Sequence, residues 1–79
     1  MNDYVATFHT HLSAMRTCNR LLTLGVSARM APVPRKLSSS CGTCLFYRAE
    51  TDQREQMDPD FEAVYQQESD TFRRILKQE

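Results

Sequence analysis

The sequence lacks the features that mark the common enzyme classes and membrane proteins. Only two of its 79 residues are glycine and three are proline. It has no glycine-rich phosphate loop, no dinucleotide-binding fingerprint, no His-Glu-x-x-His metal motif and no Ser-His-Asp pattern. No apolar run is long enough to span a bilayer, and the polar start "MNDYVATFHTH" does not resemble a signal peptide. We therefore expect a cytoplasmic protein, in a compartment that keeps thiols reduced.

The chain also lacks net charge, but its two parts differ. Residues 1–50 carry six basic and two acidic groups, whereas residues 51–79 carry four basic and eight acidic groups. The basic first part favours a small anion or an acidic partner. Because no dense run of Lys and Arg occurs, and no aromatic residues alternate with basic ones, we expect no nucleic-acid partner. We expect no membrane partner either.

The first fifty residues predict a strand, a helix and two more strands. "YVATFH" (4–9) alternates and is rich in β-branched and aromatic residues. "THLSAMRTCNRLLTLG" (10–25) predicts a helix with a threonine N-cap, a glycine just past its end, and Cys18 on its apolar face. "VSARMAPV" (26–33) and "TCLFYRAE" (43–50) predict the other strands. The strand–helix–strand start predicts two parallel strands in one sheet.

The last part of the chain predicts one long helix over residues 58–78, and a helix that breaks near Ser69 and Asp70 is the alternative. "DPDFEAVYQQESDTFRRILKQE" opens with an Asp-Pro pair, which is typical of a helix start. Two apolar triads stand eleven residues apart, close to three helical turns. They are Phe61, Val64, Tyr65 and Phe72, Ile75, Leu76. The order βαββα predicts an α+β, ferredoxin-like fold, with a small sheet of about three strands and two helices packed on it. We expect a single domain over residues 1–79, with residues 3–49 as its βαββ core.

The loop "PVPRKLSSSCGTC" collects two of the three prolines, one of the two glycines and two of the three cysteines. We interpret it as a loop that presents the Cys41 thiol. Gly42 removes side-chain bulk beside the sulfur, and Ser40 offers a small hydroxyl. Arg35 and Lys36 could stabilise the thiolate and help a partner to dock. A plain connecting loop with an unreactive cysteine is the alternative interpretation.

Cys44 leaves further interpretations open. On a strand it would share a face with Phe46 and be a small buried residue. Alternatively, Cys41-Gly-Thr-Cys44 is a dithiol pair, although such pairs usually precede a helix and here a strand follows. A third option adds His9 and His11 as zinc ligands. One C-x-x-C with one H-x-H is a weak pattern for zinc, so we expect no metal.

The residues around this loop resemble a small domain family described as selenium/sulfur carrier-like. The resemblance covers residues 3–49 and is most specific in "PVPR…SSSCG". It implies that Cys41 accepts sulfur or selenium and passes it on, as a persulfide or a selenium adduct. The implied partner is a cysteine desulfurase or another sulfur- or selenium-transfer protein, and no cofactor is implied. A carrier or accessory protein is favoured over an independent enzyme, and Cys44 lies outside the family pattern.

A protein-interaction module without chemistry is the second hypothesis. The six apolar residues of the predicted C-terminal helix exceed what a three-stranded sheet would cover. Part of this helix could therefore bind a partner or join two copies into a homodimer. This hypothesis predicts that Cys41→Ser has no effect, whereas charged substitutions at Phe72 or Ile75 disrupt association.

Overall fold

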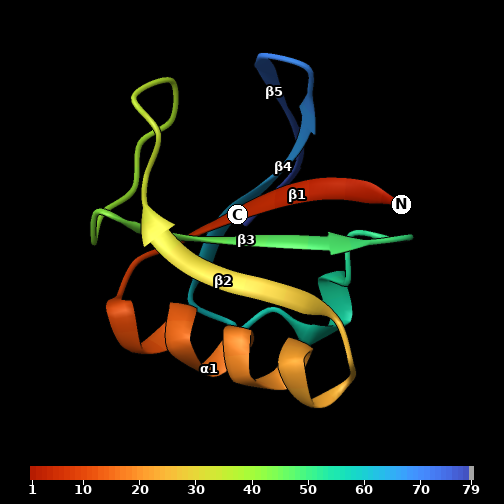
Figure 1. The fold of residues 1–79 in the computed structure, drawn as a ribbon. Helices are drawn as coiled ribbons and strands as arrows, with labels where there is room; N and C mark the ends of the chain where they lie inside the picture. The colour runs from red at the N-terminus through yellow and green to blue at the C-terminus, as the bar shows by residue number, and fades with distance from the viewer. Residues whose placement is uncertain (79) are drawn as a thin grey trace.

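The computed structural model describes residues 1–78, which form a five-stranded antiparallel sheet with a helix on one face (Figure 1). The strand order is β2-β3-β1-β4-β5. In chain order the elements are β1 (Asn2–Phe8), α1 (His11–Thr23), β2 (Ser27–Pro32), β3 (Thr43–Ala49), the 3-10 turn η1 (Arg54–Gln56), β4 (Phe61–Glu68) and β5 (Thr71–Lys77). Within the described residues, neither helical segment has the length and apolar character needed to cross a membrane.

The predictions for the first fifty residues are confirmed, with element ends within two residues of the expected ones. Thr10 caps α1, because its hydroxyl accepts a hydrogen bond from the Ser13 amide at 3.1 Å. Gly25 follows the helix with a φ of 83°, the left-handed conformation that glycine adopts easily. Strands β1 and β2 both pair antiparallel with β3, so they run parallel to each other with β3 between them.

The prediction of a C-terminal helix over residues 58–78 is wrong, and with it the two-helix ferredoxin-like fold. This segment forms the antiparallel hairpin β4–β5, which makes the sheet five strands wide instead of three. The chain reverses at residues 69–70, where Ser69 has a φ of 55° and Glu68 lies opposite Thr71. The apolar triads do not share a helix face. Val64 instead lies opposite Leu76 on the neighbouring strand.

The Asp-Pro pair explains this error physically. Asp58 and Pro59 begin a β-turn, in which the Phe61 amide donates to the Asp58 carbonyl at 2.9 Å. The Asp58 side chain also accepts from the Asp60 amide at 3.2 Å. Asp followed by Pro is as favourable at the start of a turn as at the start of a helix. The helical surface expected to bind a partner is therefore absent from the described residues, where Phe72 and Ile75 are half-buried on β5.

The main core lies between α1 and one face of the sheet. Tyr4, Ala6 and Phe8 point toward the helix from the central strand β1, and all three are buried. Cys18 and Leu21 pack against them from α1, which confirms Cys18 as a core residue. Burial of these side chains supplies most of the stabilisation expected for so small a chain.

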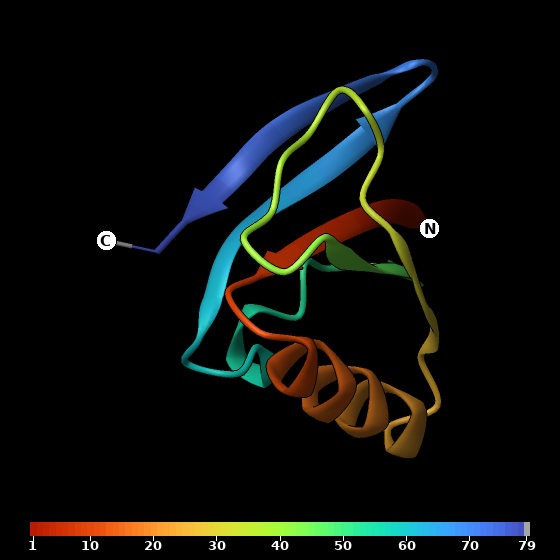
Figure 2. The ribbon, with the colours of Figure 1, turned by 90° about the vertical axis from the view of Figure 1, so that its left-hand side faces the viewer.

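The loop between β2 and β3, residues 33–42, covers the other face of the sheet. Figure 1 shows it on the side opposite α1, and in Figure 2 it passes in front of β4. Val5, Thr7 and Cys44 point to this face and are almost completely buried, although no helix lies there. The predicted cysteine loop is thus a second layer of the fold, and its position is set by the sheet beneath it.

Candidate functional site: the Cys41 loop

Cys41 is the accessible thiol of this chain. It is half-buried in the loop, whereas Cys18 and Cys44 are buried, and all three cysteines are free. The loop closes where the Val33 amide donates to the Gly42 carbonyl at 3.2 Å. Gly42 has a φ of 75°, and an added Cβ would meet no atom within 4 Å. Glycine is therefore favoured here by the backbone conformation and not by crowding.

The Cys41 sulfur has two polar neighbours. Its Sγ donates to the Thr43 carbonyl at 3.4 Å and lies 3.7 Å from the Ser39 Oγ. The Ser39 hydroxyl donates to the Phe8 carbonyl at 2.9 Å, which ties the loop to the end of β1. Because a hydroxyl carries one proton, Ser39 can donate to a sulfur anion only by turning away from Phe8. The Cys41 sulfur thus lies between a carbonyl oxygen and a hydroxyl that is close enough to turn toward it.

Ser40, which precedes Cys41, is held by a carboxylate from β4. Its amide donates to Glu62 Oε1 at 3.2 Å and its hydroxyl donates to Glu62 Oε2 at 2.6 Å. His9 Nδ1 lies 3.4 Å from the same Oε2 and 3.4 Å from the Ser40 Oγ. Because Ser40 donates to Glu62 and not to His9, this cluster positions the loop and does not activate Ser40 as a nucleophile.

Sequence analysis missed Glu62, because it placed this residue on a helix. Thr7 of β1 lies opposite Ala63 of β4, so the strand pairing brings the start of β4 beside the end of β1. The alternation of Phe61, Ala63 and Tyr65 was the available sign of a strand. Nothing local to Glu62 indicates its contact with Ser40, which lies 22 positions earlier in the chain.

Arg35 and Lys36 lie at the far end of the loop from its closure at Gly42. The Lys36 ammonium donates to the Asp70 carbonyl in the β4–β5 turn. Arg35 lines a hollow together with Ser69 and Asp70. Their contacts in the structure are thus with the hairpin, and none is with the Cys41 sulfur.

Cys44 is chemically unlike Cys41. Its side chain is fully buried on β3, and its Sγ donates to the Pro32 carbonyl at 3.7 Å. Burial raises the pKa of the Cys44 thiol to about 11, although the Arg29 guanidinium partly opposes this shift. Cys44 is therefore a protonated thiol at neutral pH. The buried strand position expected for it is confirmed, and the dithiol role stays a prediction.

The N-terminus of α1 already holds an anion from the chain itself. Asp60 Oδ2 accepts hydrogen bonds from the Ser13 hydroxyl at 2.6 Å and the Thr10 hydroxyl at 3.0 Å. The bond from Ser13, followed by the one from Thr10, holds the pKa of Asp60 below its usual range. The partial positive charge at this helix end is thus matched by Asp60, which leaves less of it to stabilise a thiolate.

The two histidines have separate partners. His9 contacts Ser40 and Glu62, whereas His11 Nδ1 lies 3.5 Å from the Thr43 hydroxyl. Among residues 1–78, no three His, Cys, Asp or Glu side chains are grouped as metal ligands would be.

Comparison with known proteins assigns the chain to a family. The family model described as "Putative Se/S carrier protein-like" matches residues 3–57, which is more than half of the chain. The chain therefore belongs to this family of selenium/sulfur carrier-like proteins, as the resemblance indicated. No curated protein matches the sequence, and no solved structure matches the fold. The hairpin β4–β5, which supplies Glu62, lies outside the matched residues.

Proposed function

We propose that this protein carries a sulfur or selenium atom on Cys41 as an accessory in a transfer reaction. Membership of the carrier-like family supports sulfur or selenium as the atom that is carried. The observation that carries the choice of residue is the difference in exposure, because Cys41 is the cysteine that solvent reaches. A carrier must meet a donor and then an acceptor, and a surface loop allows both contacts.

The step requires only exchange between sulfur atoms. The Cys41 thiolate attacks the outer sulfur of a persulfide on the donor, which would be a cysteine desulfurase or another carrier. A bond forms between Cys41 Sγ and that sulfur, the donor's S–S bond breaks, and the donor cysteine leaves as a thiolate. The proton of Cys41 is released to solvent or to that thiolate, so there is no net oxidation. Attack by an acceptor thiolate on the outer sulfur then returns Cys41.

The loop supports each stage of this step. Ser39 lies close enough to turn its proton toward an anionic sulfur. Glu62 holds Ser40 and thereby limits where the next residue can go. Cys44 stays protonated and buried, so it does not compete for the outer sulfur. We place the protein in the cytoplasm, where the three thiols would stay reduced.

Intact-protein mass spectrometry tests the proposal. The reduced protein is incubated with cysteine and a cysteine desulfurase, beside Cys41→Ser and Cys44→Ser. We expect a gain of one sulfur atom in the wild type and in Cys44→Ser, and its complete loss in Cys41→Ser. Selenocysteine in place of cysteine tests selenium. An equal gain in all three proteins, or no gain in any, would contradict the assignment of Cys41.

A further inference from the structure

The six basic residues in the first fifty positions separate onto the two faces of the sheet. Arg16 and Arg20 on α1 lie 3.9 and 3.8 Å from the carboxylate of the buried Asp58, which they neutralise. The remaining four line two neighbouring hollows on the face opposite α1. These four are Arg29, Arg35, Lys36 and Arg48. The positive charge of the first part of the chain is therefore concentrated on the face that also carries the cysteine loop.

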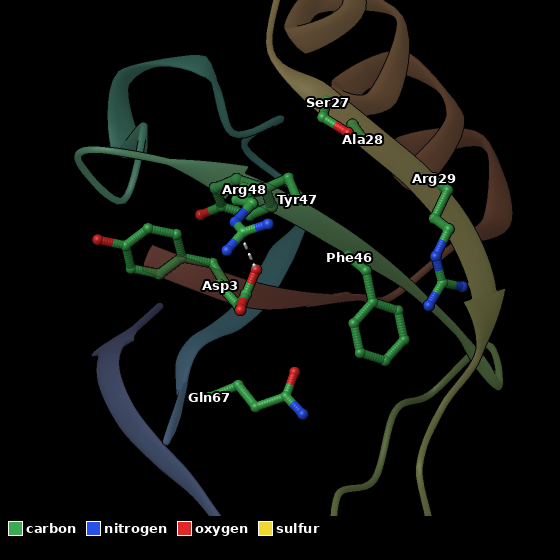
Figure 3. A pocket seen from close by; sticks show the side chains of 9 residues that line it. Asp3, Ser27, Ala28, Arg29, Phe46, Tyr47, Arg48 and Gln67 are labelled. Carbon is green, nitrogen blue, oxygen red and sulfur yellow. Dashed lines mark ion pairs between the residues drawn. The ribbon is translucent and has the colours of Figure 1, made fainter. Parts of the chain in front are cut away.

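The first hollow has a volume of about 540 Å³ and lies over β2, β3 and the start of β1 (Figure 3). The Arg29 guanidinium stacks on Phe46, with its central carbon 4.7 Å from the ring centroid. Arg48 Nε lies 3.4 Å from Asp3 Oδ1. In Figure 3, Phe46 lies between the two arginines, and Gln67 approaches from β4. The hollow thus combines an aromatic surface with two guanidinium groups.

The second hollow, of about 470 Å³, lies between the cysteine loop and the β4–β5 turn. Arg35 and Lys36 line it from the loop, and Phe72 lines it from β5. Gln67 lines both hollows, so they lie next to each other. We call the two together the basic groove. Each half of the groove offers two cations and one half-buried phenylalanine, and the buried Tyr4 and Tyr47 also line the first half.

The charges of the basic groove are available for binding. Four cations face two acidic groups, Asp3 and Asp70, which leaves a net charge of +2. Arg29 forms no ion pair with any described residue, and the Arg48–Asp3 pair is more than half exposed on both sides. Exposed pairs of this kind contribute little to stability, so a ligand carboxylate can replace Asp3 at little cost.

The spacing of the cations indicates the kind of ligand. Two of them line each of two adjacent hollows, whereas cations that bind a single phosphate would line the same hollow. Of the aromatic residues that line the groove, Tyr4 and Tyr47 are buried and only Phe46 and Phe72 are half-buried, and no dense row of cations occurs. This is less than single-stranded nucleic acid usually requires. We propose that the basic groove docks an extended acidic segment of a partner protein.

The position of the groove relates it to Cys41. Arg35 and Lys36 belong to the same loop as Cys41, so a partner in the groove also touches the loop that presents the thiol. That this partner delivers or accepts the sulfur rests on the proposed function. The binding of an acidic segment does not, because it needs no thiol. Cys41→Ser should therefore bind an acidic peptide as well as the wild type does.

An NMR titration of the isotope-labelled full chain tests the inference at low ionic strength. The probe is an octaglutamate peptide, beside octaglutamine and an eight-nucleotide oligouridylate. We expect octaglutamate to shift the amides of residues that line the groove, and octaglutamine to shift none. Arg29→Gln should weaken binding about fivefold, the size of one exposed charge contact. Arg73→Gln is the matched control, since Arg73 is exposed and pairs with Glu68 away from the groove.

Three outcomes would overturn the inference. Wild-type protein could show no shifts with octaglutamate, Arg73→Gln could weaken binding as much as Arg29→Gln, or oligouridylate could occupy the groove more tightly than the peptide. Binding that persists in a protein that gains no sulfur would leave the groove assignment intact and contradict only the proposed function. Sulfur transfer to Cys41 without binding of octaglutamate would contradict the groove assignment and leave the proposed function intact.

Discussion

Cys41 and Cys44 are three positions apart and differ in almost every physical respect. Cys41 lies in a loop, half-exposed, with a hydroxyl and a carbonyl beside its sulfur. Cys44 lies on β3, has no exposed surface, and has its pKa raised by burial to about 11. The change from loop to strand at Thr43 separates the two environments. The environment of each of these two thiols thus follows from the backbone element on which it lies.

The largest expected effect of this difference is on alkylation. At pH 7.5, we expect iodoacetamide to modify Cys41 about 100-fold faster than Cys44, because a pKa of about 11 leaves few thiolates and burial blocks access. Peptide mapping after timed quenching would measure the two rates. In 8 M urea the same reagent should modify all three cysteines at similar rates. Comparable rates for Cys41 and Cys44 in the folded protein would contradict the comparison.

A smaller effect is expected on stability at high pH. The unfolded chain releases the Cys44 proton near pH 9, whereas the folded protein keeps it until about pH 11. The folded state therefore binds more protons in this interval, and the free energy of unfolding must fall as the pH rises from 9 to 11. Over this range we expect the free energy of unfolding of the wild type to fall by about 2 kcal/mol more than that of Cys44→Ala.

Urea unfolding at pH 8, 10 and 11 in the presence of a reductant would measure this loss. Burial also raises the pKa values of Cys18 and Tyr47, but both residues are present in both proteins, so their contributions cancel in the difference. Below pH 9 the difference in stability between wild type and Cys44→Ala should not change with pH. If the free energies of unfolding of wild type and Cys44→Ala changed equally from pH 8 to 11, this would contradict the buried, protonated state of Cys44.

The parts of the site that were predicted from sequence depend on local patterns. The glycine and prolines define the loop, and the alternation of Cys44 with Leu45 places Cys44 on one face of a strand. The burial of Cys44 follows from such alternation combined with the cover that the loop provides. Local spacing predicts the face of the strand on which Cys44 lies, because side chains alternate along a strand independently of its tertiary contacts.

The parts that were not predicted depend on contacts distant in sequence. The helix predicted from the sequence over residues 58–78 begins with the Asp-Pro pair, so it would place Asp60 in the first turn of a C-terminal helix. The structure instead places Asp60 at the N-terminus of α1, where it binds Thr10 and Ser13. An acidic residue does lie at the start of a helix, but this helix is α1 and not the predicted C-terminal helix. The pairing of β1 with β4 brings Asp60 to the N-terminus of α1. No local sequence pattern shows this pairing.

The smallest expected effect is that of Glu62 substitutions on the rate at which Cys41 is alkylated. They test whether the position of the loop controls access to the thiol. Glu62→Ala removes both acceptors of Ser40, so the loop should open more often and iodoacetamide should modify Cys41 about two- to fivefold faster. Glu62→Gln keeps one acceptor and should restore most of the wild-type rate. Glu68→Ala, on the same strand but paired with Arg73, is the control and should leave the rate unchanged. If Glu62→Ala and Glu68→Ala behave alike, Glu62 does not position Cys41, and the other contacts of the loop, which include those of Ser39 and Lys36, hold it in place.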